Sequence, residues 1–199
     1  MTFAVVPAAG KGTRMGREKL TLPLGGRTIL ERVIGALREG GVEHVLVVLG
    51  PHVGHLVALV EKAGAEAIVA TEETSHMRTT IEEGLEHLRR RFDPADRDLW
   101  MLAPADHPLL NSMVTAALIE TAIHQPAHSI YIPTYCSRRG HPVLFRWKHT
   151  AGIRAFAADK GINEYIRAQS DEVRELRVMT HDILFDMDTM EDYERLLRM

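Results

Sequence analysis

The sequence predicts an α/β fold, a Rossmann-like three-layer α/β/α arrangement with a mainly parallel central sheet. Short apolar runs alternate with segments of helical periodicity, which is the order of elements in parallel α/β proteins. The run Asp98–Asp106 is continuously apolar, as is typical of a strand covered on both faces. The 199 residues suffice for a sizeable core, so we expect a single domain over residues 1–199.

The clearest elements lie before residue 128. Four apolar runs predict strands, namely Phe3–Val6, His44–Gly50, Ala65–Ala70 and Asp98–Asp106. Four amphipathic segments predict helices, namely Ile29–Arg38, His52–Gly64, His76–Phe92 and Ser112–Ile123. The helical period is plain in the first helix, whose apolar residues stand at 29, 30, 33, 34 and 37, and Gly40 and Gly41 follow as a helix stop.

The pattern becomes less regular after Ser129. The segments SIYIPTY and PVLF predict two short strands around a loop that contains Ser137–His141. Two short helical stretches, a strand over VRELRVM and a final helix over Met190–Met199 complete the prediction. No internal repeat or long linker interrupts this order.

Composition and charge argue against several classes of partner. The net charge of −3 gives no global basic field that would attract nucleic acid or a membrane surface. No run of about 18 apolar residues is present to span a bilayer. The single cysteine, Cys136, fits a reducing compartment. With no secretory signal pattern, we expect a cytoplasmic protein that is a monomer or a weak homo-oligomer.

The glycine-rich stretch after the first strand, FAVVPAAGKGTRMGREK, fits neither common nucleotide-binding motif. Gly10 and Gly12 match the dinucleotide fingerprint G-x-G-x-x-G, but Met15 stands where its third glycine belongs. The P-loop pattern fails as well, because Gly16 is followed by Arg17 rather than by lysine. Both motifs are therefore rejected.

The stretch still has the features of a phosphate-binding loop. Small residues allow backbone N–H groups to approach a ligand closely, at Ala8, Ala9, Gly10 and Gly12. Arg14 and Lys19 add a guanidinium fork and an ammonium that together suit a triphosphate. The position also fits, because open α/β sheets bind ligands at the carboxyl ends of their strands. The alternative is a glycine-rich turn with solvated charges.

Three aspartates are candidate metal ligands. Asp106, in PADHPLL, ends the fourth predicted strand and is placed either to hold Mg²⁺ with the phosphates or to cap the next helix. Asp186 and Asp188 precede the last helix and share one side if the segment is extended, although Asp188-Thr189 is equally a candidate helix N-cap. Asp106 with Asp188 would make a two-carboxylate Mg²⁺ site. His107 is either a metal ligand or a locally hydrogen-bonded side chain.

Five blocks of the chain together resemble one known family. PAAGKGTRMGREKLTLPLGGRTIL is similar to A-A-G-x-x-x-R-M-G-x-x-K-L-x-x-P-L, and HMRTTIEEGL resembles G-M-S-x-S-L-x-x-G-L. PADHPLL resembles P-C-D-Q-P-L-L, GHPVLF resembles G-x-P-x-L-F, and DMDTMEDY resembles D-I-D-T-P-E-D-L. These are the signatures of the nucleotidyltransferases of the molybdenum cofactor and their sugar-phosphate relatives. The resemblance implies a sheet of the nucleotide-diphosphosugar-transferase type.

Within that superfamily the chain is most similar to the molybdenum cofactor cytidylyltransferases. Ala8–Gly10 favours them over the guanylyltransferase branch, whose loop begins L-A-G-G. The D-x-A-R-P block of the methylerythritol-phosphate cytidylyltransferases is absent. Four positions depart from the family pattern, namely His76 for Gly, Arg78 for Ser, Ala105 for Cys and His107 for Gln. These departures leave the choice of base and acceptor open.

The resemblance implies Mg²⁺-dependent transfer of a nucleoside monophosphate from a nucleoside triphosphate, with CTP favoured, to a phosphorylated acceptor, with molybdopterin favoured. It implies a nucleotide-binding half over 1–128 and an acceptor-side and C-terminal half over 129–199. The nucleotide-binding residues would be Ala8, Ala9, Gly10, Gly12, Thr13, Arg14, Lys19 and Thr80. The catalytic residues would be Arg14, Lys19 and Asp106; the metal ligands Asp106 and Asp188; and the acceptor-side residues Gly140, His141 and Pro142.

Other functions stay open at this point. One is a guanylyltransferase or a sugar- or alcohol-phosphate nucleotidyltransferase of the same superfamily. Another is a non-catalytic nucleotide-binding module, which the altered PADHP block makes conceivable. A scaffold protein is the third, because folds outlive functions.

Overall fold

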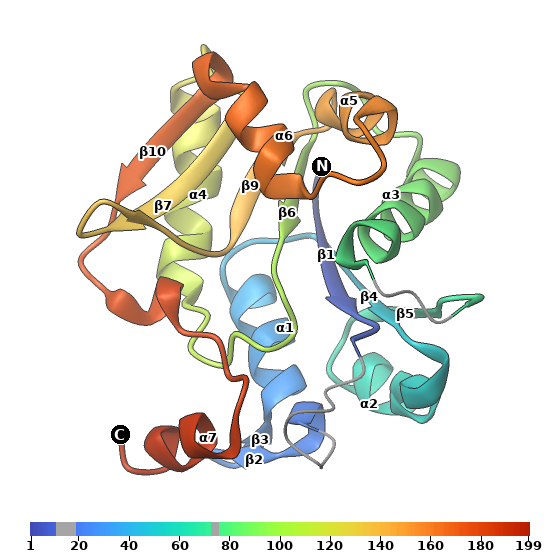
Figure 1. Cartoon of the computed structure of the whole chain (residues 1–199), viewed down its shortest axis with the longest axis vertical. Helices are drawn as coiled ribbons and strands as arrows, with labels where there is room; N and C mark the ends of the chain where they lie inside the picture. Colours follow the sequence, from blue (N-terminus) through green and yellow to red (C-terminus); the bar gives the residue numbers. More distant parts are fainter. Residues whose placement is uncertain (11–18, 73–75) are drawn as a thin grey trace.

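The computed structural model describes residues 1–10, 19–72 and 76–199 (Figure 1). Eight strands form the central sheet: β1 (Thr2–Ala8), β4 (His44–Leu49), β5 (Glu66–Val69), β6 (Leu99–Leu102), β7 (Ile130–Tyr135), β8 (Arg138–Arg139), β9 (Val143–Arg146) and β10 (Val173–Arg177). The strand order is β10-β7-β9-β6-β1-β4-β5, and β8 pairs with β7. Neighbours β5, β4, β1 and β6 run parallel, as do β7 and β10. The expected mainly parallel sheet is therefore confirmed, with β9 inserted antiparallel between β6 and β7.

Helices cover both faces of this sheet, which gives the expected three layers. One face carries α1 (Ile29–Glu39), α2 (Val57–Lys62) and α4 (Ser112–His124). The other carries α3 (Met77–Phe92), α5 (His149–Ala155) and α6 (Ile162–Ala168). Successive residues of β1 alternate between the two cores, since Ala4 and Val6 join the first and Phe3 and Val5 the second. Apolar residues on both faces explain why this strand reads as a continuous apolar run.

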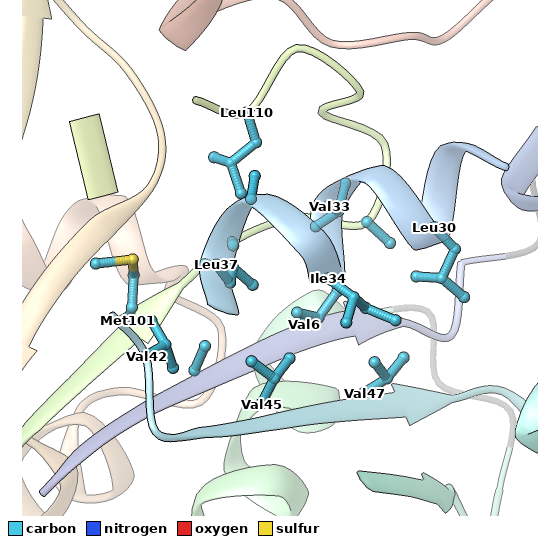
Figure 2. Close-up of a cluster of buried hydrophobic side chains, with 14 of the residues drawn as sticks. Val6, Leu30, Val33, Ile34, Leu37, Val42, Val45, Val47, Met101 and Leu110 are labelled. Atoms are coloured by element: carbon cyan, nitrogen blue, oxygen red, sulfur yellow. The ribbon is translucent and has the colours of Figure 1, made fainter. Parts of the chain in front are cut away.

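Figure 2 shows how α1 lies across β1 and β4. Leu30, Ile34 and Leu37 are fully buried, at the spacing that predicted the helix. Its start is fixed by a capping box, in which the Thr28 side chain accepts from the Glu31 N–H at 3.2 Å and Glu31 accepts from the Thr28 N–H at 2.7 Å. Satisfied end groups and a buried face explain why the prediction for this helix is accurate.

The C-terminal segment returns to the N-terminal part of the chain (Figure 1). Helix α7 (Met190–Leu196) packs with the hairpin of β2 (Pro23–Leu24) and β3 (Arg27–Thr28), and Tyr193 Oη donates to the Pro23 carbonyl at 2.6 Å. Met187, fully buried, belongs to the same apolar cluster. This packing places the residues just before α7 beside those just before β2.

Three local expectations need correction. The predicted helix His52–Gly64 is divided into a 3₁₀ segment η3 (Pro51–Leu56) and α2, with non-helical backbone at Val53. The predicted strand Asp98–Asp106 pairs only over β6, because Pro104, two residues after its end, has no N–H to donate. The β2–β3 hairpin was not predicted, although Gly25 and Gly26, both with positive φ, are its turn signal. None of the helices in the described ranges combines the length and the apolarity that a bilayer span requires.

A buried polar cluster ties α5 and α6 to the start of β7. Ser129 donates to the Glu172 carboxylate, so its oxygen accepts from His149 Nε2 at 2.6 Å. His149 Nδ1 then accepts from Tyr165 Oη at 2.8 Å, and Lys148 Nζ lies 3.1 Å from the same carboxylate. Burial, followed by the charge of Lys148, lowers the pKa of His149 to about 4, so the ring is neutral at pH 7.

This cluster makes stability depend on pH. In the unfolded chain His149 protonates below its ordinary pKa of 6.5, whereas in the folded protein it does so only near pH 4. Its contribution is therefore complete above about pH 6.5 and is lost as the pH falls, which lowers the free energy of unfolding by about 2 kcal/mol between pH 7.5 and pH 5. Denaturant titrations of wild type and His149→Gln, whose amide does not titrate, measure this difference. An equal pH dependence in both proteins would contradict it.

Candidate active site

Two aspartates from distant parts of the chain meet at one lysine. Lys19 Nζ lies 2.7 Å from Asp106 Oδ2 and 3.7 Å from Asp188 Oδ1. It also donates to the main-chain oxygen of Met187 at 3.3 Å. The lysine side chain is 17% exposed, so these charges interact with only partial solvent screening. The three residues therefore form a compact charged centre at the carboxyl-end side of β6.

Main-chain contacts hold this centre in place. Lys19 opens a single 3₁₀ turn, η2 (Lys19–Thr21), and Asp106 lies in the turn after β6. The Met187 N–H donates to the Asp106 carbonyl at 2.9 Å, which joins the C-terminal segment to this turn. Asp106 does not cap the following helix, because the N-cap of α4 is Asn111. Its carboxylate is therefore available to the site.

The segment before α7 presents the carboxylates of Asp186 and Asp188 on the same side. Met187 is buried in the α7 cluster, whereas Asp186 and Asp188 both line the same cleft. The N-cap of α7 is Thr189, whose side chain accepts from the Asp192 N–H at 3.2 Å. The capping alternative for the Asp188-Thr189 pair is therefore confirmed at Thr189, whereas Asp188 itself is not the N-cap. The alternation expected for Asp186 and Asp188 is also confirmed.

The cleft has a volume of about 520 Å³. Its floor is formed by the residues after β6, by His141 just before the antiparallel strand β9 and by the segment before α7, and it includes Asp106, His107, His141, Asp186 and Asp188. The remaining lining comes from the first turn of α3 and from residues 158–164, which lead into α6. The cleft thus joins the charged centre to a wall built by the second helical layer.

Two histidines lie together in this cleft. The rings of His107 and His141 are 4.9 Å apart in an edge-on arrangement, and the Nδ1 atom of each is buried with no hydrogen-bond partner among residues 1–10, 19–72 and 76–199. Burial lowers the pKa of His107, against the opposing charges of Asp106 and Asp186. Burial, followed by the neighbouring His107, lowers the pKa of His141 to about 4. Both rings are therefore neutral at pH 7 and do not offset the carboxylates.

The Gly140–Pro142 stretch owes its position to a close backbone contact. The His141 N–H donates to the Ile183 carbonyl at 2.9 Å, and a Cβ at Gly140 would lie 2.3 Å from that oxygen. Only glycine fits this approach. The contact brings His141 to His107, and so places the stretch at the cleft, where its role toward an acceptor stays a prediction.

The other predicted residues divide into three groups. Ala8 and Ala9 are buried at the carboxyl end of β1, and Gly10 is exposed beyond it. Among the described residues, a Cβ at Gly10 would meet nothing within 4 Å, and its φ is not left-handed, so neither their packing nor backbone strain requires glycine there. Thr80 is 2% exposed in the first turn of α3. Gly12, Thr13 and Arg14 lie outside the described residues, and their roles stay predictions.

The charged centre can be tested for its fit to a divalent cation. Asp106 and Asp188 carry hard oxygen ligands and already converge on one cationic group, the Lys19 ammonium. No set of three or more metal-binding side chains is present in the described part of the chain. Two carboxylates completed by substrate phosphates suit Mg²⁺, which rarely uses an all-protein cage.

Comparison with known protein families identifies the family of the chain that carries this site. Residues 4–173 match the MobA-like NTP transferase domain. The chain belongs to this family. It is a nucleotidyltransferase by that membership, and the resemblance noted in the sequence is confirmed.

Relatives of this MobA-like chain carry different names. It is 27% identical to nicotine blue oxidoreductase of Paenarthrobacter nicotinovorans, over 97% of this chain and 95% of that protein. It is 30% identical to phosphoenolpyruvate guanylyltransferase of Rubrobacter xylanophilus, over 98% and 92%. A 43-residue match, 46% identical, links it to molybdenum cofactor guanylyltransferase of Xanthomonas euvesicatoria, over 22% and 23%. The chain spans 24 to 34% of the length of the bifunctional GlmU proteins it also matches.

Solved structures agree with this assignment. The Rv0371c protein of Mycobacterium tuberculosis matches with a TM-score of 0.80 and 26% identity, over 100% of this chain and 97% of that chain. The same protein in complex with manganese matches with a TM-score of 0.77, over 99% and 98%. These neighbours confirm the fold, and the manganese complex makes a divalent metal plausible in the family.

Sequence reasoning missed the part of the site built by the second helical layer. Arg78 was noticed only as a departure from the family pattern, whereas its side chain holds the cleft wall through main-chain carbonyls. Lys160, in that wall, was not singled out at all. A single lysine in a polar stretch carries no periodic or motif signal, so only the folded arrangement identifies it.

The close contact at Gly140 predicts that adding one methyl group there strongly lowers the free energy of unfolding. We expect Gly140→Ala to lower the free energy of unfolding by about 2 kcal/mol or more, because its Cβ meets a fixed main-chain oxygen. Gly10→Ala is the matched control and should be within about 0.5 kcal/mol of wild type, since its Cβ meets open space. Urea unfolding of the three proteins gives the comparison, and equal midpoints for the two variants would refute the account.

Proposed function

We propose that the chain transfers a nucleoside monophosphate from a nucleoside triphosphate, with CTP favoured, to a phosphorylated acceptor, with molybdopterin favoured, and releases pyrophosphate. The observation that carries the proposal is the meeting of Lys19 with Asp106 and Asp188, two aspartates that line a cleft on the side of the sheet where β6 ends. This is where open α/β sheets bind nucleotides. Family membership supplies the reaction class.

The chemistry needs positioning and charge neutralisation rather than a general base. An acceptor phosphate is already ionised at neutral pH, so its oxygen attacks the α-phosphorus in line and pyrophosphate leaves. Lys19 would exchange its contact with Asp106 for the α-phosphate and stabilise the charge that develops there. Arg14 would hold the leaving pyrophosphate. Gly10 would let the backbone approach the phosphates, which is the reason for a glycine that the fold itself does not require.

Asp106 and Asp188 would hold Mg²⁺, which neutralises phosphate charge when it is bound. Asp106 is fixed by the main-chain contact with Met187. The Asp188 side chain is 44% exposed, against 25% for Asp106. The manganese complex of Rv0371c supports a divalent ion in this family, and Mg²⁺ is the proposal for this chain.

A guanylyltransferase is the second candidate. Two relatives are named guanylyltransferases, one of them aligned along 98% of this chain. Against them stands Ala8–Gly10, whose sequence resembles the cytidylyltransferase branch. An experiment must therefore decide whether the chain prefers cytosine or guanine in its nucleotide. The proposed roles of Lys19 and the two aspartates are the same for either nucleotide.

Thermal stabilisation by nucleotides tests this choice. With Mg²⁺ present, CTP at about 100 times its Kd should add about 2.7 kcal/mol to the free energy of unfolding. GTP at the same concentration should add less. Without nucleotide, Gly10→Ala should have the same melting temperature as wild type. With nucleotide bound, its melting temperature should rise less than that of wild type. A larger shift with GTP would replace the cytidylyl proposal by the guanylyl one. The absence of any shift with all four triphosphates would refute both.

Replacing Lys19 tests the catalytic assignment. Lys19→Ala should lower kcat for pyrophosphate release by about 100-fold or more, because the developing charge on the α-phosphate loses its ammonium. Its melting temperature should change little, since the two aspartates it leaves are partly solvated. Lys62→Gln, at an exposed lysine of α2 outside the cleft, is the control. Near-normal turnover in Lys19→Ala would contradict the assignment.

A further inference from the structure

One wall of the cleft is fastened by a single arginine. The five N–H donors of Arg78 are all used within the protein, by Glu82 Oε1 at 2.7 Å and by the main-chain oxygens of Ile153 at 2.6 Å, Phe156 at 2.8 Å, Ala157 at 2.5 Å and Lys160 at 2.9 Å. The side chain is 10% exposed. A guanidinium has five donors and no acceptor, so this one has no capacity left for a ligand. Arg78 therefore positions the wall.

The carbonyls that Arg78 binds belong to the end of α5 and the loop that follows it. A helix leaves its last carbonyls without intrahelical partners, and a buried cation satisfies them well. The loop continues through Asp159 and Lys160 to Gly161, whose N–H donates to Glu164 Oε2 at 3.0 Å. Lys160 is thus fixed on both sides. Its own N–H donates to the Ala157 carbonyl at 3.0 Å, and the peptide group that follows it is held by Arg78 and by Glu164.

Lys160 has a distinctive place in the charge balance of the cleft. The described lining residues include five carboxylates, namely Asp106, Asp159, Glu164, Asp186 and Asp188. Among those same residues the lysines and arginines are Arg78 and Lys160. The Lys160 ammonium lies 3.8 Å from its sequence neighbour Asp159, in a pair that is 50% and 76% exposed. Such an exposed pair contributes little, so this ammonium can exchange its partner for a ligand.

We propose that Lys160 binds the anionic group of the acceptor and that Arg78 is the residue that positions it. The inference rests on the proposed function and narrows its acceptor side to a phosphate monoester or a group of equal charge. A dianion entering a cleft with five carboxylates is repelled unless a cation receives it. Lys19, between Asp106 and Asp188, serves the nucleotide, and Lys160 serves the acceptor from the other wall. Arg78 sets the separation of the two ammonium groups by fixing the Lys160 backbone.

The first test measures binding directly. The full chain is saturated with the nucleoside triphosphate that stabilises it most and is titrated calorimetrically with phenyl phosphate as a phosphate-monoester probe. Lys160→Gln should lower the affinity for phenyl phosphate by about tenfold or more. Lys160→Arg should bind phenyl phosphate with an affinity near that of wild type, and so should Lys62→Gln. Equal affinity in Lys160→Gln and wild type would overturn the proposal, as would a wild-type chain that binds no probe.

Kinetics separate this role from a purely structural one. With CTP and molybdopterin as substrates, Lys160→Gln and Arg78→Gln should raise KM for molybdopterin about tenfold and leave kcat and KM for CTP within about twofold. Arg78→Gln should also speed amide hydrogen exchange over residues 156–161, whereas Lys160→Gln should not. A fall in kcat with an unchanged acceptor KM would overturn the assignment. If wild type transfers to no acceptor, the proposed function fails, and the phenyl phosphate titration still decides the role of Lys160.

Discussion

The contact of Lys19 with Asp106 and Asp188 is the constraint around which the candidate active site is organised. It joins the beginning, the middle and the end of the chain, and partial burial strengthens each pair relative to water. The C-terminal segment can reach it only because α7 packs on the β2–β3 hairpin and buries Met187. A small apolar cluster remote from the central sheet thereby positions a carboxylate of the site. Changes in that cluster should act on catalysis through Asp188.

The central sheet supplies the rest of the geometry. Strands β1 and β6 are parallel neighbours, so the loop that contains Gly10 and the turn that contains Asp106 leave the sheet at the same edge. Both faces of these strands are buried, which fixes their register, because a slip by one residue would exchange the two cores. The rigid layer sets the positions of the main chain, and short loops then carry the functional side chains.

Much of this arrangement follows from the sequence, and the reasons differ between elements. Helix α1 and the strands around it were predictable, because one local pattern fixes both the element and the buried face. Asp106 and Asp188 were identified as a candidate pair from their residue type and their places after the fourth strand and before the last helix, but nothing local indicates that Lys19 joins them. The close contact of Gly140 with Ile183 and the brace at Arg78 depend on segments more than 40 residues apart. Contacts between such distant segments leave no periodic pattern and no fixed spacing in the sequence from which they could be predicted.

The charges of the cleft constrain the order in which ligands bind. His107 and His141 are neutral because burial lowers their pKa, so they leave the carboxylates of the floor uncompensated. In the described residues Lys19 offsets at most one of the two carboxylates it contacts. Asp106 and Asp188 would therefore repel a triphosphate that comes close to them, whereas a divalent cation that arrives with the triphosphate brings positive charge to these two carboxylates. The nucleotide and the metal should then fill the charged centre together. Under the proposed function, the cleft would become favourable for a second anion, the acceptor at Lys160, only after that.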